Sequence, residues 1–269
     1  MKLYADTAKS LTISDLAAMK RNGEKISCLT AYDASFAALL DQVGIDVLLV
    51  GDSLGMVIQG ANSTVPVTVE DMAYHCRCVT SAAQRAFVVA DLPFASYAEP
   101  IQALANAARL MQQGLAQMVK LEGAKIDVVR FLVDQGVPVC GHLGLLPQSV
   151  NRLGGYRVQG RDAAQAEAIL REAQQLEQAG AGLLVLECVP AVLAKTISHT
   201  LNIPVIGIGA GVDCDGQVLV LYDMLNIGTG NRPRFSRNFM AGAASIEDAV
   251  CRYHQAVKAA QFPGSEHSY

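Results

Sequence analysis

Short apolar runs and segments with helical spacing alternate along most of this chain. The runs are four to six residues long and predict buried strands, whereas the segments between them place apolar residues three and four positions apart. After the first run, Asp33 is suited to cap the start of a helix and Gly44 to end it. We expect strands near residues 26–30, 47–50, 87–90, 117–122, 137–142, 182–187, 203–207 and 217–221.

The same signals predict further helices. Thr68 and Asp71 have the spacing of a capping box, and the residues after them repeat apolar side chains with a helical period. The segment before the first strand, Ser14 to Lys20, predicts a short extra helix that could close the amino-terminal end of a barrel. Other helices are expected near residues 100–113, 125–135, 162–179, 191–199 and 245–259.

This alternation decides the fold class. Eight strands alternating with helices in about 250 residues match the size and rhythm of a closed (β/α)8 TIM barrel. An open, doubly wound sheet is the alternative, and a dinucleotide-binding fingerprint would favour it. The Gly-rich candidate, Gly207 to Gly211, follows a late strand without the full spacing or a ribose-binding acid. We therefore expect one barrel domain over residues 1–269 and no nicotinamide cofactor.

Composition narrows the class of function. Of the 269 residues, 51% are hydrophobic, so the chain can bury a large core. The net charge of -4 comes without a Lys/Arg cluster, which argues against nucleic-acid binding. There is no signal segment and no apolar stretch of about 18 residues. Seven cysteines without regular spacing indicate reduced, buried thiols. We expect a soluble, cytoplasmic protein with small-molecule partners and no membrane contact.

Carboxylates follow several of the predicted strands. Asp52, Asp91 and Glu187 each end an apolar run, and a fourth run carries Lys120 and ends at Glu122. Because the carboxyl ends of parallel strands open on one side of a sheet, these side chains should gather in one place. A divalent cation is the simplest compensation for crowded anions. The pattern therefore suggests a metal-assisted active site.

Each candidate has a structural interpretation beside the functional one. Asp52 and Ser53 could simply shape the turn at residues 51–55, and Asp91 could be a turn acid. His142, at the end of the fifth strand, could be a structural histidine or contact a substrate. Sequence alone leaves both interpretations open for each of these positions.

The later strands give sharper expectations. Lys120 and Glu122 alternate on one strand and so share a face, where burial would be costly unless they were paired or bound to a ligand. Glu187 follows four apolar residues, and burial would raise its pKa toward the range of a general base. Its neighbour Cys188 should project to the opposite side. No Gly-x-Ser-x-Gly elbow is present, which argues against a covalent triad. The remaining groups suit Mg²⁺ chelated by a 2-oxo acid that is deprotonated at the neighbouring carbon.

Ten short motifs, in this order, resemble the ketopantoate hydroxymethyltransferase family. The similarity runs from about Ser27 to Phe239, and the tail from Pro263 to His267 is also similar. Ala124 departs from a usual second Gly, and Leu146 from a common Thr. The motifs are 29–33 (LTAYD), 50–55 (VGDSLG), 66–69 (PVTV), 90–93 (ADLP), 119–123 (VKLEG), 141–144 (GHLG), 147–151 (PQSVN), 154–160 (GGYRVQG), 187–190 (ECVP) and 206–211 (IGIGAG).

The resemblance implies a (β/α)8 barrel that assembles as a homodecamer and binds Mg²⁺. It implies transfer of a hydroxymethyl group from 5,10-methylenetetrahydrofolate to 3-methyl-2-oxobutanoate, through a Mg-stabilised enolate, in pantothenate biosynthesis. Desolvation would strengthen this chemistry, so the loop at residues 144–160 is expected to close over the site. By position, the implied metal ligands are Asp52, Asp91 and Glu122, the implied substrate contacts are Asp52, Ser53, Asp91, Lys120 and His142, and the implied general base is Glu187.

Two other functions stay open at this point. One is a different Mg-dependent lyase or mutase that makes or breaks a carbon bond next to a 2-oxo acid, without folate. The other is a metabolite-binding barrel that catalyses no reaction. A binding protein has no need of a buried base at Glu187, so the sequence favours an enzyme.

Overall fold

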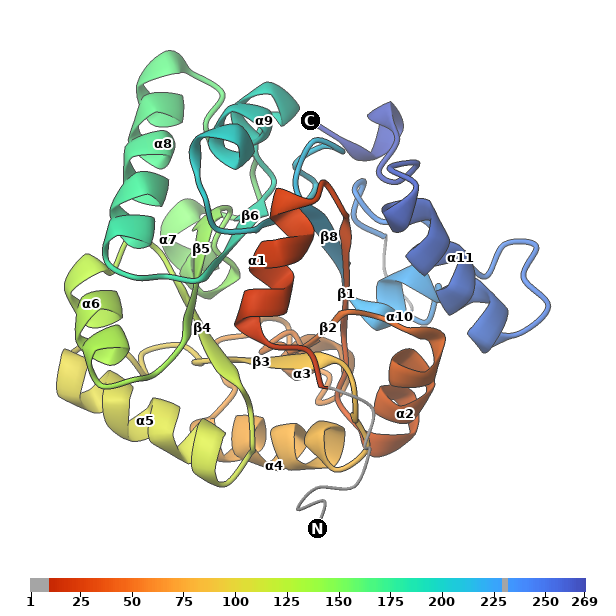
Figure 1. Cartoon of the computed structure of the whole chain (residues 1–269), viewed down its shortest axis with the longest axis horizontal. Coiled ribbons are helices and arrows are strands. Elements are labelled where there is room, and N and C mark those ends of the chain that lie inside the picture. The colour runs from red at the N-terminus through yellow and green to blue at the C-terminus, as the bar shows by residue number, and fades with distance from the viewer. Residues whose placement is uncertain (1–9, 229–231) are drawn as a thin grey trace, which may run out of the picture.

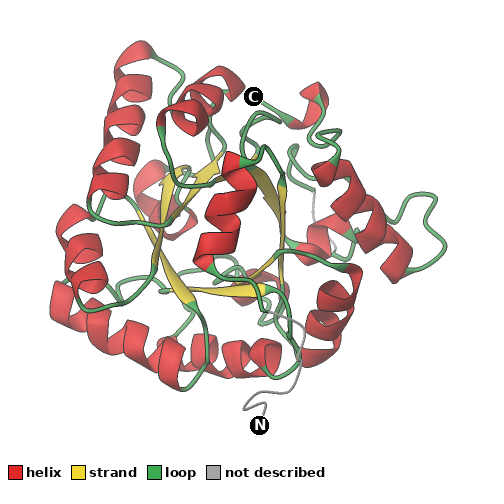
Figure 2. Cartoon of the chain, in the orientation of Figure 1, coloured by secondary structure: helices red, strands yellow, loops and turns green. Residues whose placement is uncertain are grey.

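Eight parallel strands form a closed barrel in the computed structural model, which describes residues 10–228 and 232–269 (Figures 1 and 2). Each strand pairs with the next along the chain, and the last pairs with the first. The predicted (β/α)8 barrel is confirmed, and the open sheet is excluded. The strands are β1 (Ile26–Thr30), β2 (Val47–Val50), β3 (Phe87–Asp91), β4 (Met118–Glu122), β5 (Val139–Gly144), β6 (Leu183–Glu187), β7 (Val205–Ile208) and β8 (Gly216–Leu219).

The longer helices form a ring around the barrel (Figure 2). The helix bounds that the sequence predicts agree with the structure to within about two residues, and the two N-terminal caps that it predicts are present. Asp33 accepts a hydrogen bond from Phe36 N, and Thr68 and Asp71 form the expected capping box. These helices are α2 (Ala34–Val43), α4 (Val69–Thr80), α5 (Pro100–Gln112), α6 (Ile126–Asp134), α8 (Ala163–Gln178), α9 (Ala191–Thr200) and α11 (Ile246–Lys258).

Several short helices were not predicted. Each spans only three or four residues, which is too short for an apolar repeat to be seen in the sequence. Most lie in loops that follow the strands. They are α3 (Leu54–Val57), η1 (Pro147–Ser149), α7 (Val150–Leu153), α10 (Leu221–Met224) and η2 (Ser265–His267).

Helix α1 (Ile13–Arg21) lies across the amino-terminal end of the barrel, in front of the strands in Figure 1. Its Leu16 and Met19 are buried in the same core cluster as the first residues of several strands. Lys20 pairs at 2.8 Å with Asp215, which directly precedes β8. The extra helix that the sequence predicted is confirmed, and it closes this end.

Side chains along each strand alternate between the barrel interior and the layer under the helices. In β4, Met118 belongs to the interior cluster, whereas Val119 and Leu121 belong to the outer one. Lys120 and Glu122 therefore share the interior face with Met118. The same alternation places Asp91, His142 and Glu187 in line behind interior residues of β3, β5 and β6. The interior thus changes from apolar at the amino-terminal end to polar at the carboxyl end.

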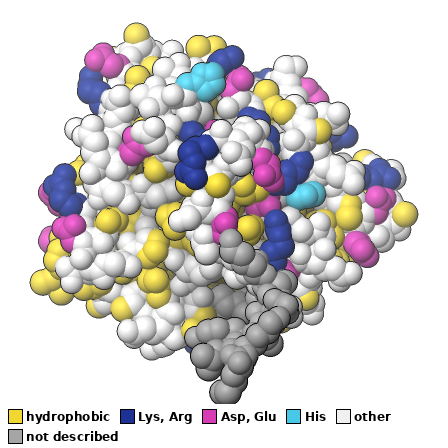
Figure 3. All heavy atoms as spheres, viewed as in Figure 1, with side chains coloured by type: hydrophobic (Ala, Val, Ile, Leu, Met, Phe, Trp, Pro, Cys, Tyr) yellow, Lys and Arg dark blue, Asp and Glu magenta, His cyan; other side chains and the backbone are white. Residues whose placement is uncertain are grey.

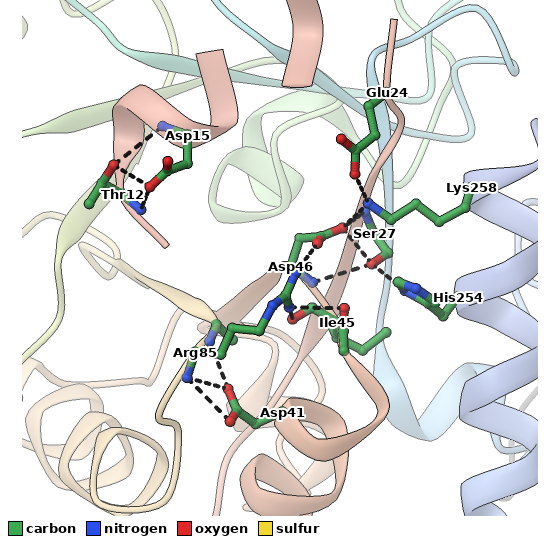
Figure 4. Close-up of polar contacts among 12 residues, drawn as sticks. Thr12, Asp15, Glu24, Ser27, Asp41, Ile45, Asp46, Arg85, His254 and Lys258 are labelled. Carbon is green, nitrogen blue, oxygen red and sulfur yellow. Dashed lines mark hydrogen bonds and ion pairs between the residues drawn. The ribbon is translucent and has the colours of Figure 1, made fainter. Parts of the chain in front are cut away.

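Asp46, which directly precedes β2, is fully buried at the amino-terminal end and fully paired (Figure 4). Its Oδ1 meets Arg85 at 2.8 Å, and its Oδ2 meets Lys258 at 2.7 Å. Oδ2 also accepts hydrogen bonds from the N–H and hydroxyl of Ser27. Burial alone would raise the pKa of Asp46, but the hydrogen bond and charge of Lys258, with Ser27 and Arg85, hold it below its usual range. This network ties β1, the start of β3 and α11 to the chain before β2.

The surface around α1 carries charged side chains of both signs, interspersed rather than grouped (Figure 3). Among the residues that the structure describes, no helix has the length and apolar character needed to cross a bilayer.

Candidate active site

A cavity of about 830 Å³ opens at the carboxyl end of the barrel. The ends of β2 to β6 all contribute to its wall, as the parallel arrangement predicted. The structure therefore brings every predicted site residue to one place. These lining residues are Asp52, Ser53, Asp91, Lys120, Glu122, His142 and Glu187.

Two buried aspartates are neighbours where β2 and β3 end. The N–H of Asp52 donates to Oδ2 of Asp91 at 3.1 Å. Gly51 leaves room for the Ser53 hydroxyl, since a Cβ there would lie 2.8 Å from Ser53 Oγ. Burial, and then the charge of Asp91, raise the pKa of Asp52 to about 7. The protein around the two acids therefore does not fully compensate their negative charge.

Lys120 supplies part of the compensating positive charge. Its Nζ lies 3.0 Å from Asp91 Oδ1 and 3.2 Å from His142 Nδ1. Burial would lower the pKa of Lys120, but the charges of Asp91, Glu122 and Asp52 raise it instead, so the ammonium stays charged. One ammonium cannot balance all the carboxylates around it. The pKa of Glu122, for example, is raised well above its usual range by burial, which Lys120 opposes and the charges of Asp52, Glu187 and Asp91 assist.

His142 lies between Lys120 and Glu187. Burial, and then the charge of Lys120, hold the pKa of His142 well below its usual range, so the ring is neutral. Because an ammonium can only donate, Nδ1 is the acceptor and the ring proton is on Nε2. Nε2 lies 3.3 Å from Glu187 Oε2, at an angle that does not yet complete a hydrogen bond. A small rotation of the ring would make Nε2–H a donor to Glu187.

Glu187 ends β6 and faces the cavity, with 13% of its side chain exposed. Burial, opposed by Lys120 and assisted by Asp52 and Asp91, raises its pKa to about 8. At the end of β5, Gly144 allows the close strand approach, because a Cβ there would collide with the carbonyl oxygen of Glu187. The raised pKa that the sequence predicted for this carboxyl is confirmed, and it suits a proton acceptor.

Ser53 and Cys188 both line the cavity. Ser53 Oγ lies 2.9 Å from Tyr32 Oη, which orients the hydroxyl. Cys188 was expected on the opposite face, but it lines the same cavity, so that expectation is wrong. Its φ is +46°, and this left-handed conformation breaks the strand alternation directly after Glu187.

Several residues of the site were not singled out from the sequence. Gln148 and Tyr97 form a buried hydrogen-bonded pair beside the carboxylates. Tyr156, Arg157 and Arg161 line the outer part of the cavity. A loop residue carries no periodic signal, so the motif at 147–151 was the available indication for Gln148.

The residues present fit a divalent cation. Carboxylate oxygens are the donors that hard cations prefer. Asp91 Oδ1 is buried and accepts no hydrogen bond from the described residues, although Lys120 is near it. Within residues 10–228 and 232–269, no three His, Cys, Asp or Glu side chains are already grouped to hold an ion. Asp52 and Asp91, which are neighbours in the cavity wall, are therefore the described residues that best fit such an ion.

Comparison with known proteins gives close relatives along almost the whole chain. The family model described as ketopantoate hydroxymethyltransferase matches residues 10–265. The 3-methyl-2-oxobutanoate hydroxymethyltransferase of Alkalilimnicola ehrlichii is 59% identical over 265 residues, which cover 98% of this chain and 96% of the relative. The protein of that name from Methylobacillus flagellatus is 60% identical over 262 residues, which cover 96% of this chain and all of the relative (100%).

Solved structures share the fold at low identity. A putative phosphonomutase from Burkholderia cenocepacia J2315 superposes with a TM-score of 0.60 at 16% identity, covering 78% of this chain and 95% of that one. A phosphonopyruvate hydrolase in complex with oxalate and Mg²⁺ gives 0.59 at 11% identity, covering 93% and 98%. A 2,3-dimethylmalate lyase of the PEP mutase/isocitrate lyase superfamily gives 0.53 at 17% identity, covering 72% and 70%. At these identities the likeness establishes the barrel fold alone.

Proposed function

Because this chain belongs to the ketopantoate hydroxymethyltransferase family, we propose that it transfers a hydroxymethyl group from 5,10-methylenetetrahydrofolate to 3-methyl-2-oxobutanoate. The product is 2-dehydropantoate, and the reaction is the first step of pantothenate biosynthesis. The family match favours this reaction over a folate-independent lyase or mutase and over a barrel that only binds a metabolite.

Asp52 and Asp91 would hold a divalent cation, Mg²⁺ in this proposal, and Glu122 would join them directly or through water. When bound, the cation would act as a Lewis acid toward the oxygens of the 2-oxo acid. The contact between the Asp52 backbone and the Asp91 carboxylate supports this assignment. Asp91 Oδ1 supports it as well, because this atom is buried beside Lys120 and accepts no hydrogen bond from the described residues. The same two aspartates would then border the bound substrate.

Lys120 and Ser53 would orient the substrate through its anionic and keto oxygens. The 2-oxo acid carries a negative carboxylate, and Lys120 is a buried donor in the cavity whose pKa the neighbouring acids raise. A charge pair is stronger in such a poorly solvated site than at the surface. His142, which contacts Lys120, would border the substrate on the side of Glu187.

Glu187 would remove the proton from the branched carbon, C3, of the oxo acid. The electron pair of the C–H bond stays on the substrate as an enolate, and the proton moves to the Glu187 carboxylate. A pKa of about 8 makes Glu187 a stronger base than an ordinary carboxylate. By donating to the Glu187 carboxylate, the Nε2–H of His142 would keep that carboxylate directed at C3. Lys120 would compensate the charge that develops on the substrate oxygen.

The enolate carbon would then form the new bond to the methylene carbon of the folate. Both carbon–nitrogen bonds of the folate methylene would break, and water would supply the hydroxyl group. The other proton of that water and the proton taken from C3 would end on the two folate nitrogens, so tetrahydrofolate leaves and the atoms balance. The second substrate would occupy the outer part of the cavity, whose whole volume of about 830 Å³ lies in the range of ligand pockets, about 300–1,000 Å³. Closure of the loop at residues 144–160 would exclude bulk water, and hydrogen exchange in that loop should slow when the oxo acid binds.

The family match over residues 10–265 carries this proposal, because it includes every residue of the charged cluster. The test uses purified protein, Mg²⁺ and 3-methyl-2-oxobutanoate in deuterated water. We expect exchange of the C3 proton without folate, and 2-dehydropantoate when methylenetetrahydrofolate is added. Exchange without product would favour a folate-independent enzyme. If the protein gives no exchange and no product, that result would contradict an enzyme of this family.

We further propose that the protein acts in the cytoplasm as a homodecamer, as its family implies. All seven cysteines have free thiols, which suits a reducing compartment. Sedimentation of the purified chain at ten times the monomer mass of 28.5 kDa would support the decamer.

A further inference from the structure

Gln148 is buried among the ends of three strands. Its side-chain Nε2 donates to Asp52 Oδ2 at 2.8 Å and to the carbonyl of Leu92 at 2.9 Å. Its backbone N–H donates to Glu122 Oε2 at 3.1 Å. One residue in η1 therefore contacts Asp52 after β2, the chain after β3, and Glu122 at the end of β4.

The orientation of the Gln148 amide is determined by its neighbours. The carbonyl of Leu92 can only accept, so the amide nitrogen must face it. On the other side, Tyr97 Oη donates to Gln148 Oε1 and accepts from the N–H of Glu122 at 3.3 Å. Both amide protons and the amide oxygen are thus used. Turning the amide over would leave buried groups without partners, which is costly.

This arrangement holds carboxylates that would otherwise move apart. When both are ionised, Asp52 and Asp91 carry like charges in a buried site, and rotation of Asp52 would relieve their repulsion when no cation is present. The donor on Asp52 Oδ2 opposes that rotation. Glu122 is held in the same way, through its carboxylate by Gln148 and through its backbone by Tyr97.

We propose that Gln148 and Tyr97 are positioning residues that hold the Asp52 and Glu122 carboxylates ready for a divalent cation. This inference rests on the proposed function, because it assigns the role toward the cation of that same site. Partners that hydrogen-bond to metal ligands set the ligands' orientation, and their loss typically costs about 10–100-fold in metal affinity or activity. Neither residue needs to touch the substrate.

The experiment measures Mn²⁺ binding by titration followed with electron paramagnetic resonance, on folded protein without substrate. Gln148→Leu should weaken Mn²⁺ binding by about 10–100-fold. Tyr97→Phe removes one hydroxyl and should weaken it less. In the double variant the losses should not add, because the two side chains act in one chain of hydrogen bonds.

The matched control is Gln217→Leu, the same substitution at another buried glutamine. Gln217 is a buried residue of β8, and its side chain donates to the carbonyl of Gly211 at 2.9 Å. It does not belong to the cavity wall formed by the described residues. Its variant should lose stability but keep the wild-type Mn²⁺ affinity. Circular dichroism and the thermal midpoint confirm that each variant is folded when it is titrated.

Two results would overturn the positioning role. One is wild-type Mn²⁺ affinity in folded Gln148→Leu, and the other is an equal loss of affinity in Gln217→Leu. In both cases the wild-type protein still binds Mn²⁺ and turns over, so the proposed function stands. A wild-type chain without Mn²⁺ affinity would contradict the metal site itself, and the positioning role would fail with it.

Discussion

Two buried aspartates stand at opposite ends of β2, and their surroundings differ completely. Asp46, before the strand, meets Arg85 and Lys258 and accepts two hydrogen bonds from Ser27. Asp52, after the strand, faces Asp91 and shares a single nearby lysine with it. Burial is nearly the same for both, yet the pKa of Asp46 is lowered and that of Asp52 is raised to about 7.

The difference separates residues that stabilise the barrel from residues of the candidate active site. A buried carboxylate whose charge is paired and whose oxygens are hydrogen-bonded can stay ionised inside the fold. A buried carboxylate without enough partners costs stability, and it is kept because a ligand completes the site. At the amino-terminal end of this barrel the buried charge is therefore paired, whereas at the carboxyl end several buried carboxylates share the ammonium of Lys120.

The largest effect should come from Glu187 at the carboxyl end. Glu187→Gln removes the proton acceptor but keeps the shape, so kcat should fall by about 10²–10⁴-fold. Binding of the oxo acid, measured by calorimetry, should change little. Exchange of the C3 proton followed by NMR gives the same step in isolation. Near-normal exchange would remove Glu187 from the mechanism.

At the amino-terminal end the corresponding change should affect folding and not catalysis. Asp46→Asn removes the buried counter-ion of Arg85 and Lys258, which are themselves partly exposed, so the free energy of unfolding should drop by about 1–3 kcal/mol. Urea denaturation measures that loss. The kcat of the folded fraction should stay at the wild-type value. A loss below about 1 kcal/mol would mean that solvent replaces the network.

Metal binding should then distinguish the two ends directly. A cation that binds only the folded protein stabilises it by about 2.7 kcal/mol at a concentration of 100 times Kd. This gain, measured as the shift of Tm on adding Mg²⁺, should appear in wild type and in Asp46→Asn. It should disappear in Asp91→Asn. An unchanged shift in Asp91→Asn would place the metal elsewhere.

The smallest expected effect is the pH dependence of the Asp46 contribution. Its pKa is lower in the folded protein than the unfolded value of about 3.9, so the unfolded chain takes up the proton first as the pH falls. The stabilisation is therefore complete above about pH 4 and is lost below it, by at most about 1.4 kcal/mol per pH unit. The stability gap between wild type and Asp46→Asn should narrow on acidification in that range. A gap that widens would give the wrong sign.

Much of the carboxyl end could be predicted from the sequence. Strand periodicity places Lys120 and Glu122 on one face, and parallel strands bring Asp91 and Glu187 beside them, so pattern alone gathers the charged cluster. Cys188 shows where this reasoning fails. The backbone at Cys188 has a positive φ, which the alternation of side chains along a strand does not predict.

The hydrogen-bond networks could not be predicted in the same way. Asp46 takes its partners from Ser27, Arg85 and Lys258, which lie far apart in the chain and have no shared spacing. Gln148 has the same character, because its role depends on where a loop crosses the barrel mouth. Such contacts follow from tertiary packing, which a single sequence does not display.

The most direct test replaces Asp52 by Asn in the metal-free protein and measures the free energy of unfolding at neutral pH. If the carboxyl end is short of positive charge, removing this carboxylate should leave stability unchanged or increase it, while Mg²⁺ binding is lost. A loss as large as that expected for Asp46→Asn would contradict the account, because Asp52 would then be a stabilising charge like its counterpart across β2.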